Sequence, residues 1–480
     1  MNSQKNQQHL LWRAGFGPSF QDLHYPGNKS PQDIYKDLFQ KSQGELQQLI
    51  VVTATSLGIE KGEMMRSGIN TLTNEQKAKL RKLNREGFKK LNLLWLDEMT
   101  NSPAQLREKV ALFWHGHFAC RVNNILHQQE LLHIIRTHAL GDFKTLLIEV
   151  SKSAAMLSFL NNQQNRKKKP NENFARELME LFTLGHGNYT EQDVKESARA
   201  FTGWGFKPGG EFVFRAALHD GDQKTFLGES GNFSGEDIIA IILKQKQTAR
   251  FITEKAIGFF AGSIPSEKIV QKISDDFYSS SYSIPVLLAS IFTSTWFYEE
   301  KISGNKIKSP VEWIIGIRRT INLDESQKDW QLIMQKLLGQ VIFFPPNVAG
   351  WPGGTNWIDS STLMYRLRFP ILLNGNTVDL GNPKNDDDLE MGRPANVEKI
   401  KSGSNGISNK LSLHADWVAY TKHFEMISRD KLMNAVRSSI LIKDHLDQAV
   451  LEKHVNRSSR EEYIRSLTIK LMSTPDYQLC

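Results

Sequence analysis

The sequence has few cysteines and no long apolar run. Its 480 residues include only Cys120 and Cys480, which excludes a disulfide framework and a paired-cysteine zinc motif. This scarcity fits a reducing compartment, although large exported proteins can also lack disulfides. The N-terminal segment MNSQKNQQHLLWRAGFG has no apolar core of signal-peptide length. We therefore expect no membrane span and, for the chain as written, a cytoplasmic location, or export if a leader is missing from it.

Common enzyme signatures are also absent. The chain has no Gly-x-Ser-x-Gly nucleophile elbow, no phosphate-binding P-loop and no dinucleotide-binding glycine pattern. No repeat of solenoid period and no heptad run is found. What remains is an ordinary globular composition, with 40% hydrophobic and 23% charged residues. The length is sufficient for a large core and more than one subdomain.

Positive charge is only mildly in excess. The chain has 60 basic and 52 acidic residues, for a net charge of +8. Nucleic-acid binding needs a focused basic face, so this total disfavours a nucleic-acid partner. The most basic segment is a predicted helix from Asn74 to Met99, which carries the cations from Lys77 to Lys90. We interpret it as a surface helix with a solvated cationic face. The alternative is a dock for a polyanion, through this helix and Arg166 to Lys169.

The best-defined element is a predicted helix from Asn171 to Gly187. Asn171 can cap its first turn, and Gly185 and Gly187 can end it. A wide apolar arc leaves one narrow polar stripe, which consists of Asn173, Arg176, Glu177 and Glu180. We expect this helix to be buried on most sides, so that the stripe meets water, a salt-bridge partner or a site.

Helical patterns dominate the rest of the chain, and the best strand candidate is Glu211 to Leu218. The predicted fold is mainly α: a large multi-helical globular domain with a minor β-hairpin or short strand near residues 211–228, and a small helical C-terminal region. We expect residues 1–373 to form the main domain. Residues 374–408, rich in Gly, Asn, Asp and Ser, are predicted to be a linker or surface excursion, and residues 409–480 the helical C-terminal region.

Seven separated stretches between about residues 9 and 370 stand in one order. They are HLLWRAGFG, LREKVALFWHGHFA, NENFARELMELFTLGHGNYTEQDV, ESARAFTGW, HDGDQKTFLG, KSPVEWIIG and PPNVAGWPGGTNWIDS. Together they resemble the signature blocks of the bacterial domain-of-unknown-function 1800 family. The resemblance implies a mostly helical bacterial protein, and it supplies no activity and no catalytic residue. The resemblance also implies that many relatives are exported, whereas we expect no export signal in this chain as written.

The segment FWHGHF, residues 113–118, holds the sharpest candidate metal ligands. His115 and His117 could bind zinc, copper or iron through neutral imidazole. Side chains two residues apart share a face on a strand but not on a helix. The pair therefore converges only if Gly116 ends or distorts the helix that we predict to start at Ser102-Pro103. In a helix it is easier for one histidine to be a ligand and the other a hydrogen-bonded core residue. The helical context favours structural roles for this pair over metal binding or catalysis.

A second candidate is the loop His219-Asp220-Gly221-Asp222, which follows the predicted strand. His219 and Asp220 could complete a metal shell begun by His115 or His117. His219 could instead act as a general base held by a carboxylate. The alternative is a turn that uses Asp and Gly for its backbone geometry.

The polar stripe of residues 171–187 is the third candidate. Glu177 and Glu180 lie three residues apart on one face, so they could bind a metal or divide acid and base roles. Arg176 and Glu180, four residues apart, could equally form an intrahelical salt bridge. Glu177 is the stronger catalytic candidate, because it lies on a narrow polar stripe of a helix that is otherwise apolar.

Three tryptophans, Trp204, Trp351 and Trp357, lie in turns rich in Gly and Pro. Exposed tryptophans on stiff loops can stack on sugars and other flat ligands. The commoner role is to anchor a loop in the core, and we favour it here.

Two functional hypotheses follow. The first is a metal-assisted enzyme, with hydrolysis as the leading reaction class and a divalent metal as cofactor. Its catalytic residues are Glu177, His219 and Asp220, its metal ligands are His115, His117, His219 and Asp220, and its binding residues are Arg176, Glu180, Trp204, Trp351 and Trp357. The second is a non-catalytic helical binding or assembly protein that presents the Trp-bearing Pro/Gly loop and the basic helix to a protein or glycan. The residues alone do not decide whether the protein is an enzyme.

Overall fold

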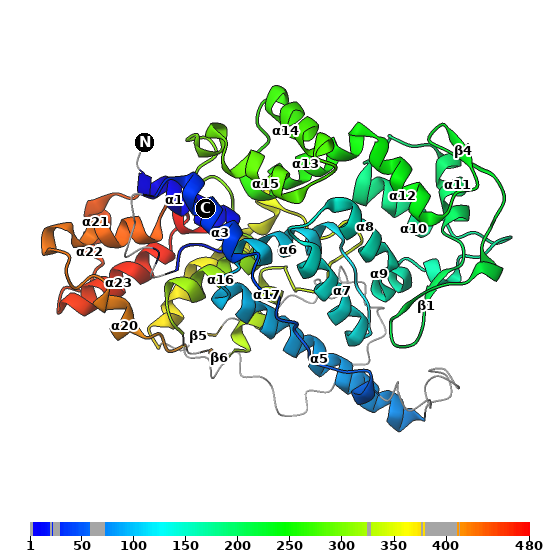
Figure 1. Cartoon of the computed structure of the whole chain (residues 1–480). Coiled ribbons are helices and arrows are strands. Elements are labelled where there is room, and N and C mark those ends of the chain that lie inside the picture. Colours follow the sequence, from blue (N-terminus) through cyan, green and yellow to red (C-terminus); the bar gives the residue numbers. More distant parts are fainter. Residues whose placement is uncertain are drawn as a thin grey trace.

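Helices make up most of the chain in a computed structural model (Figure 1), which confirms the predicted mainly α fold. The structure describes residues 3–19, 22, 29–57, 73–323, 328–375, 378–379, 410–411 and 413–480. Most of the predicted linker, residues 374–408, lies outside the described residues. None of the described helices combines the length and the apolar character that crossing a membrane requires.

The helices lie along the whole described chain. Their bounds are α1 Ser3–Ala14, α3 Pro31–Lys41, α5 Asn74–Asn101, α6 Gln105–His117, α7 Ile125–His138, α8 Phe143–Lys152, α9 Ala154–Phe159, α10 Asn173–Glu177, the π-helix η4 Leu178–Thr183, α11 Glu191–Ala200, α12 Gly235–Lys244, α13 Lys246–Ala261, α14 Glu267–Ser279, α15 Ile284–Phe292, α16 Pro310–Thr320, α17 Trp330–Leu337, α18 Ser360–Arg368, α20 Trp417–Lys422, α21 Arg429–Ile440, α22 Gln448–Lys453 and α23 Arg460–Met472. Short 3₁₀ turns are η1 Thr55–Leu57, η3 Asn162–Gln164, η5 Ala216–Leu218, η6 Thr295–Tyr298, η8 Gly354–Trp357, η9 Phe369–Leu373 and η10 Asp476–Gln478.

Strands form only short antiparallel hairpins in the described residues. The pairs are β1 Trp204–Phe206 with β2 Phe212–Phe214, β3 Lys224–Phe226 with β4 Glu229–Gly231, and β5 Val378–Asp379 with β6 Lys410–Leu411. Two of these hairpins fall near residues 211–228, where a minor β element is predicted. The predicted strand Glu211 to Leu218 is shorter than expected, because the chain turns into η5 after β2.

Capping boxes mark the starts of several helices. Thr190 and Asp193 form a reciprocal capping box at α11, and Ser309 and Glu312 form another at α16. The predicted start of α6 at Ser102-Pro103 is wrong by a few residues. Ser102 follows the last residue of α5, and its hydroxyl accepts a hydrogen bond from Ala104 N at 3.1 Å before α6 begins.

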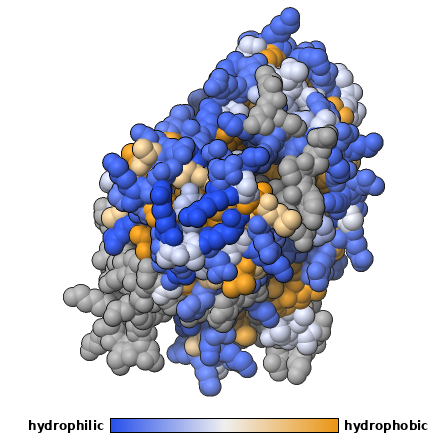
Figure 2. All heavy atoms as spheres, turned by 90° about the vertical axis from the view of Figure 1, so that its left-hand side faces the viewer, coloured by the Kyte–Doolittle hydropathy of each residue, from blue (hydrophilic) through white to orange (hydrophobic). Residues whose placement is uncertain are grey.

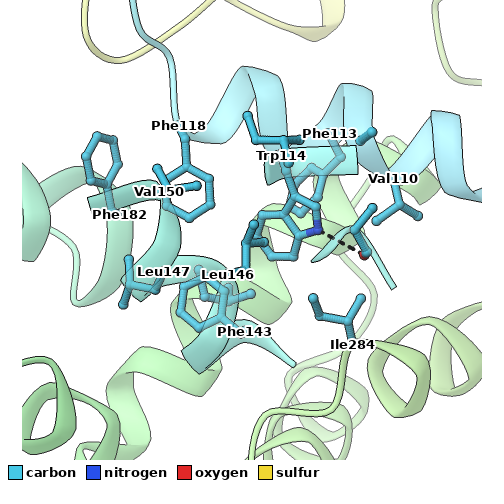
Figure 3. Close-up of a cluster of buried hydrophobic side chains, with 14 of the residues drawn as sticks. Val110, Phe113, Trp114, Phe118, Phe143, Leu146, Leu147, Val150, Phe182 and Ile284 are labelled. Atoms are coloured by element: carbon cyan, nitrogen blue, oxygen red, sulfur yellow. Dashed lines mark hydrogen bonds between the residues drawn. The ribbon is translucent and has the colours of Figure 1, made fainter. Parts of the chain in front are cut away.

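Helix α6 lies in the centre of the largest apolar cluster. Figure 3 shows Trp114 of α6 surrounded by apolar side chains from other helices and loops, with its indole N–H 3.3 Å from the carbonyl oxygen of Ala139. Phe118 packs against Phe182 of η4 with ring centroids 5.4 Å apart. This contact attaches the π-helix to the core.

Charged residues of α6 are buried as pairs. Glu108 accepts hydrogen bonds from the Trp95 indole at 3.0 Å and from the Arg136 guanidinium at 2.8 and 2.9 Å. Lys109 pairs with Glu312 of α16, and both side chains are inaccessible to solvent. Because buried charges are costly unless paired, these contacts hold α6 in one orientation.

A second apolar cluster joins α16 and α17 to the C-terminal helices. Trp313 and Trp330 pack on Phe369, and the cluster continues through α20, α21 and α23. Figure 2 shows the side of the molecule on the left of Figure 1, and hydrophilic side chains predominate on it. A pocket of about 290 Å³ lies between α1 and α21, lined by residues that include Gln8 and Arg437. None of the site residues predicted from the sequence lines it.

Candidate functional site

The predicted helix of residues 171–187 contains a π-helical segment. Helix α10 is followed directly by η4, Leu178–Thr183. The Thr183 hydroxyl donates to the carbonyl oxygen of Leu178, five residues back, at 2.6 Å. The Gly185 N–H donates to the Met179 carbonyl at 3.1 Å. A π-turn widens the helix, and such segments occur frequently at functional sites.

This widening changes the partners of Glu180. The predicted Arg176–Glu180 salt bridge is not formed, because the π-helix alters the usual i, i+4 geometry. Glu180 accepts a hydrogen bond from the Tyr189 hydroxyl at 2.5 Å, and its other oxygen lies 3.6 Å from His186 Nδ1. Arg176 pairs instead with Glu191 of α11 through two hydrogen bonds, at 2.7 and 2.8 Å.

Glu177 precedes the π-helix and is half-buried. Its carboxyl group has no hydrogen-bond or ion-pair partner among the described residues. Burial raises its pKa, the negative charge of Glu180 raises it further, and Arg176 acts in the opposite direction. Among the described carboxyl groups with a resolved shift, Glu177 is the one whose pKa is raised.

The loop that ends this segment needs glycine at Gly185. Its φ is +82°, and an added Cβ would lie 3.0 Å from the Phe251 ring. The Asn188 amide donates to the Leu184 carbonyl at 3.0 Å, and the Gln247 amide of α13 donates to the same oxygen at 3.2 Å. The turn therefore holds His186, whose side chain is 89% exposed, at the surface beside Glu180.

His219 lies in the loop after η5 and is half-buried. Its Nδ1 is 2.9 Å from the Thr202 carbonyl oxygen. Because a carbonyl only accepts, Nδ1 carries the proton in this contact, and Nε2 has the lone pair of the neutral ring. Nε2 has no hydrogen-bond partner among the described residues. His219 is thus oriented as a base or ligand would be.

Asp220 has a structural environment. Its carboxylate accepts two hydrogen bonds from Arg199 of α11, at 2.8 and 3.2 Å, and one from Asp222 N at 3.0 Å. The Arg199 hydrogen bonds lower its pKa, followed by the smaller contribution of the Asp222 backbone, while burial opposes both. The buried Lys224 ammonium donates to the carbonyl oxygen of Asp220 at 2.7 Å. These contacts match the turn that was the alternative interpretation of this loop.

The two histidines of α6 face different surroundings, because the helix continues through Gly116 to His117. His115 is buried against Trp95, Phe343 and Trp351. Its Nε2 accepts a hydrogen bond from Phe343 N at 3.2 Å, and burial lowers its pKa to about 3. The lone pair of Nε2, which a metal would need, is therefore occupied.

His117 lies among other aromatic rings, including Phe143, Phe182 and Phe251. Its Nε2 is 3.0 Å from the Phe182 carbonyl oxygen. Burial lowers its pKa to about 3, and the charge of Lys255 acts in the same direction. This contact links α6 to η4, so His117 has a structural role in packing the π-helix against α6.

The predicted metal shell is not assembled. No group of three or more His, Cys, Asp or Glu side chains in the described part of the chain is placed to hold a metal ion. His115, His117, His219 and Asp220 each bind different protein groups. The proposal that these four form one shell therefore lacks support in the geometry.

The two candidate segments bind different ends of helix α11. Arg176 of α10 binds Glu191 at its start, and Asp220 of the His219 loop binds Arg199 near its end. Eight residues of α-helix span about 12 Å. No hydrogen bond or ion pair joins Glu177 to His219 among the described residues. The carboxyl pair and His219 are best treated as separate groups.

The three tryptophans are mostly buried. Trp204 is 4% exposed and Trp357 is 7% exposed. Trp351 is half-buried with its ring 5.4 Å from that of His115. These positions suit loop anchors in the core and leave little ring surface for a sugar.

Sequence reasoning missed Tyr189 and Arg199. Tyr189 binds the Glu180 carboxylate, and burial followed by this hydrogen bond raises the pKa of its hydroxyl, so Tyr189 stays protonated. A signal was present, because Tyr189 directly follows the glycine turn that ends the π segment. The role of Arg199 had no local signal, since its partner Asp220 is 21 residues away.

The family comparison covers nearly the whole chain. The family model described as "Protein of unknown function (DUF1800)" matches residues 9–479. The chain belongs to the DUF1800 family. The match extends past the last of the seven signature stretches and through the C-terminal helices. Comparison with curated proteins and with solved structures gives no match.

Proposed function

We propose that this DUF1800 protein is an acid–base enzyme, a hydrolase, whose site is the carboxyl pair Glu177 and Glu180. The proposal rests on the π-helix, which places the two carboxyl groups in different surroundings. Glu177 is half-buried without a described partner, whereas Glu180 accepts a hydrogen bond from Tyr189. Two carboxyl groups in unlike surroundings are the arrangement that divides acid and base roles.

The roles follow from these contacts. Glu177, whose pKa is raised mainly by burial, acts as the proton donor. Glu180 acts as the carboxylate that accepts a proton from water, and Tyr189 fixes its orientation. His186 stands at the open side of the pair, where it can contact a substrate. A pocket of about 110 Å³ lies between α13 and α14, and the carboxyl pair does not line it. Its one link to this segment is Gln247, which lines the pocket and donates to the Leu184 carbonyl after η4.

A metal-assisted form of this reaction would use the same two carboxylates with His186. It needs further ligands that the described residues do not bring to this point. Elemental analysis of the purified protein separates the two forms. Stoichiometric metal that is lost in a folded Glu180→Gln variant would support the metal-assisted form, and activity in the presence of chelator would support the metal-free form.

The test is hydrolysis of chromogenic esters, phosphate esters and glycosides by the wild type and by Glu177→Gln. We expect kcat/KM to fall by about 10²- to 10⁴-fold in the variant, because it removes a proton donor. The matched control is Glu149→Gln, which changes another half-buried glutamate with no described partner. Full activity in folded Glu177→Gln would refute the proposal. Absence of any hydrolysis by the wild type would favour the helical binding or assembly protein.

A further inference from the structure

More than half of the net charge of the protein lies in one short segment. Residues 74–90 contain seven cations and two acidic residues, Glu75 and Glu86. Their net charge is +5, against +8 for all 480 residues. The cations are Lys77, Lys79, Arg81, Lys82, Arg85, Lys89 and Lys90. The small net charge of the whole chain is therefore compatible with a focused basic face, which polyanion binding requires.

This segment is the N-terminal half of α5, and it runs out from the body of the molecule (Figure 1). Six of the seven cations are exposed, and Lys77 is half-buried. The C-terminal half of the same helix is buried through Leu91, Trp95 and Leu96. The folded core thus holds the basic half at the surface as a rigid extension.

Few of these cations have protein partners. Lys82 lies 3.9 Å from Glu86, and Lys89 lies 2.7 Å from Asp329. The other five have no ion pair or hydrogen bond to another side chain among the described residues. They are therefore available to a partner with negative charge.

The cations also form a row along the helix. Lys77, Arg81, Arg85 and Lys89 follow one another at intervals of four residues, a row about 18 Å long. Like charges at this spacing repel and destabilise an isolated helix. Cations near a helix N-terminus are also disfavoured by the helix dipole. The helix would be more stable without this row, so a binding role explains it better than local stability does.

The apolar side of the segment points to a phosphate backbone rather than a membrane. Leu80 and Leu83 are partly buried against the main core. No described apolar side chain of α5 is among the exposed large hydrophobic residues of the protein. A helix that inserts into a membrane surface needs such an exposed apolar face. The remaining attraction is electrostatic and extends along a line, as does the charge of a nucleic acid.

We propose that the N-terminal half of α5 docks on the phosphate backbone of duplex nucleic acid, without reading its sequence. The three members of the row without described partners, Lys77, Arg81 and Arg85, each neutralise one phosphate. Release of the counterions gives a salt dependence of log K on log[salt] with a slope of about −2.7. Between about 50 and 200 mM salt, this slope weakens binding about 40-fold.

The test is fluorescence anisotropy of a labelled DNA duplex of random sequence with the full-length protein. The variant Lys77→Gln/Arg81→Gln/Arg85→Gln removes all three contacts. Its slope should approach zero, so that the same salt change has little effect on any remaining binding. Glutamine has a helix propensity close to that of Lys and Arg, so the variant should keep its fold, which circular dichroism checks.

The matched control is Lys144→Gln/Lys195→Gln/Lys268→Gln, which removes the same charge from exposed sites on α8, α11 and α14. It should retain the wild-type slope and affinity. Equal losses in the two variants would show a general charge effect and overturn the proposal. Binding to anionic phospholipid vesicles or to a sulfated glycan, with none to DNA, would also overturn it.

Discussion

Helices α6 and the α10–η4 segment touch each other but differ in how their polar groups are used. In α6, the Glu108, Lys109 and His115 side chains are buried, and each binds a group from another part of the chain. In α10–η4, Glu177 has no described partner, and Glu180 is held at the surface by Tyr189. Residue type does not distinguish a structural group from a candidate site here. What distinguishes them is whether the side chain already forms hydrogen bonds or ion pairs with other protein groups.

The largest effect that tests this comparison is on stability. His115→Ala should lower the free energy of unfolding by about 3 kcal/mol, because it opens a cavity and leaves Phe343 N–H without its acceptor. His186→Ala, at an exposed position, should change it by less than about 0.5 kcal/mol. Urea denaturation measures both. Equal and small losses would show that His115 is not the structural group that its contacts indicate.

The pH dependence of stability should have opposite signs in the two regions. The pKa of His115 is lowered from 6.5 to about 3, so the unfolded chain binds a proton first, and stability is lost as the pH falls below 6.5. From pH 7 to pH 5 this loss is about 2 kcal/mol. His115→Gln, which keeps an acceptor, should remove that part of the loss.

Glu177 should give the opposite pH dependence of stability, measured in the same way. Its folded pKa is raised above 4.5, so the folded state binds the proton first, and stability is lost as the pH rises through the folded pKa. Glu177→Gln should therefore gain stability relative to the wild type between pH 4 and pH 7, in urea denaturation. A variant that parallels the wild type throughout would mean that Glu177 is as solvated as a surface glutamate.

The smallest effect concerns the pair that holds α10 on α11. Arg176→Ala should cost about 0.2 to 1 kcal/mol, because Arg176 and Glu191 are both partly exposed. Lys144→Ala, at an exposed site on α8 without a described ion pair, is the control, and it should have no measurable effect. A loss above about 2 kcal/mol would show that this pair also fixes the π-helix. In that case the contrast between the engaged polar groups of α6 and the available ones of α10–η4 would fail, because Arg176 would be a structural group.

Local signals predicted the parts of this fold that depend on neighbouring residues. The capping boxes at Thr190 and Ser309 use partners three residues away, so the sequence displays both members. The strand predicted before His219 was too long, because the extent of β2 depends on its pairing with β1 across a turn. The π-helix had no sequence signal of this kind. It forms where Phe182 packs on Phe118 while Thr183 bonds back to Leu178.

The sequence by itself determined the mainly α fold and the position of the acidic stripe, because periodicity and capping act within a few residues. The family followed from the resemblance of the seven signature stretches. Only the tertiary structure decided which polar groups remained available. His115 was engaged by Phe343, 228 residues away, and Asp220 by Arg199. Glu177 kept a carboxyl group without a described partner. Such contacts depend on which distant segments the core brings together, and no local pattern records them.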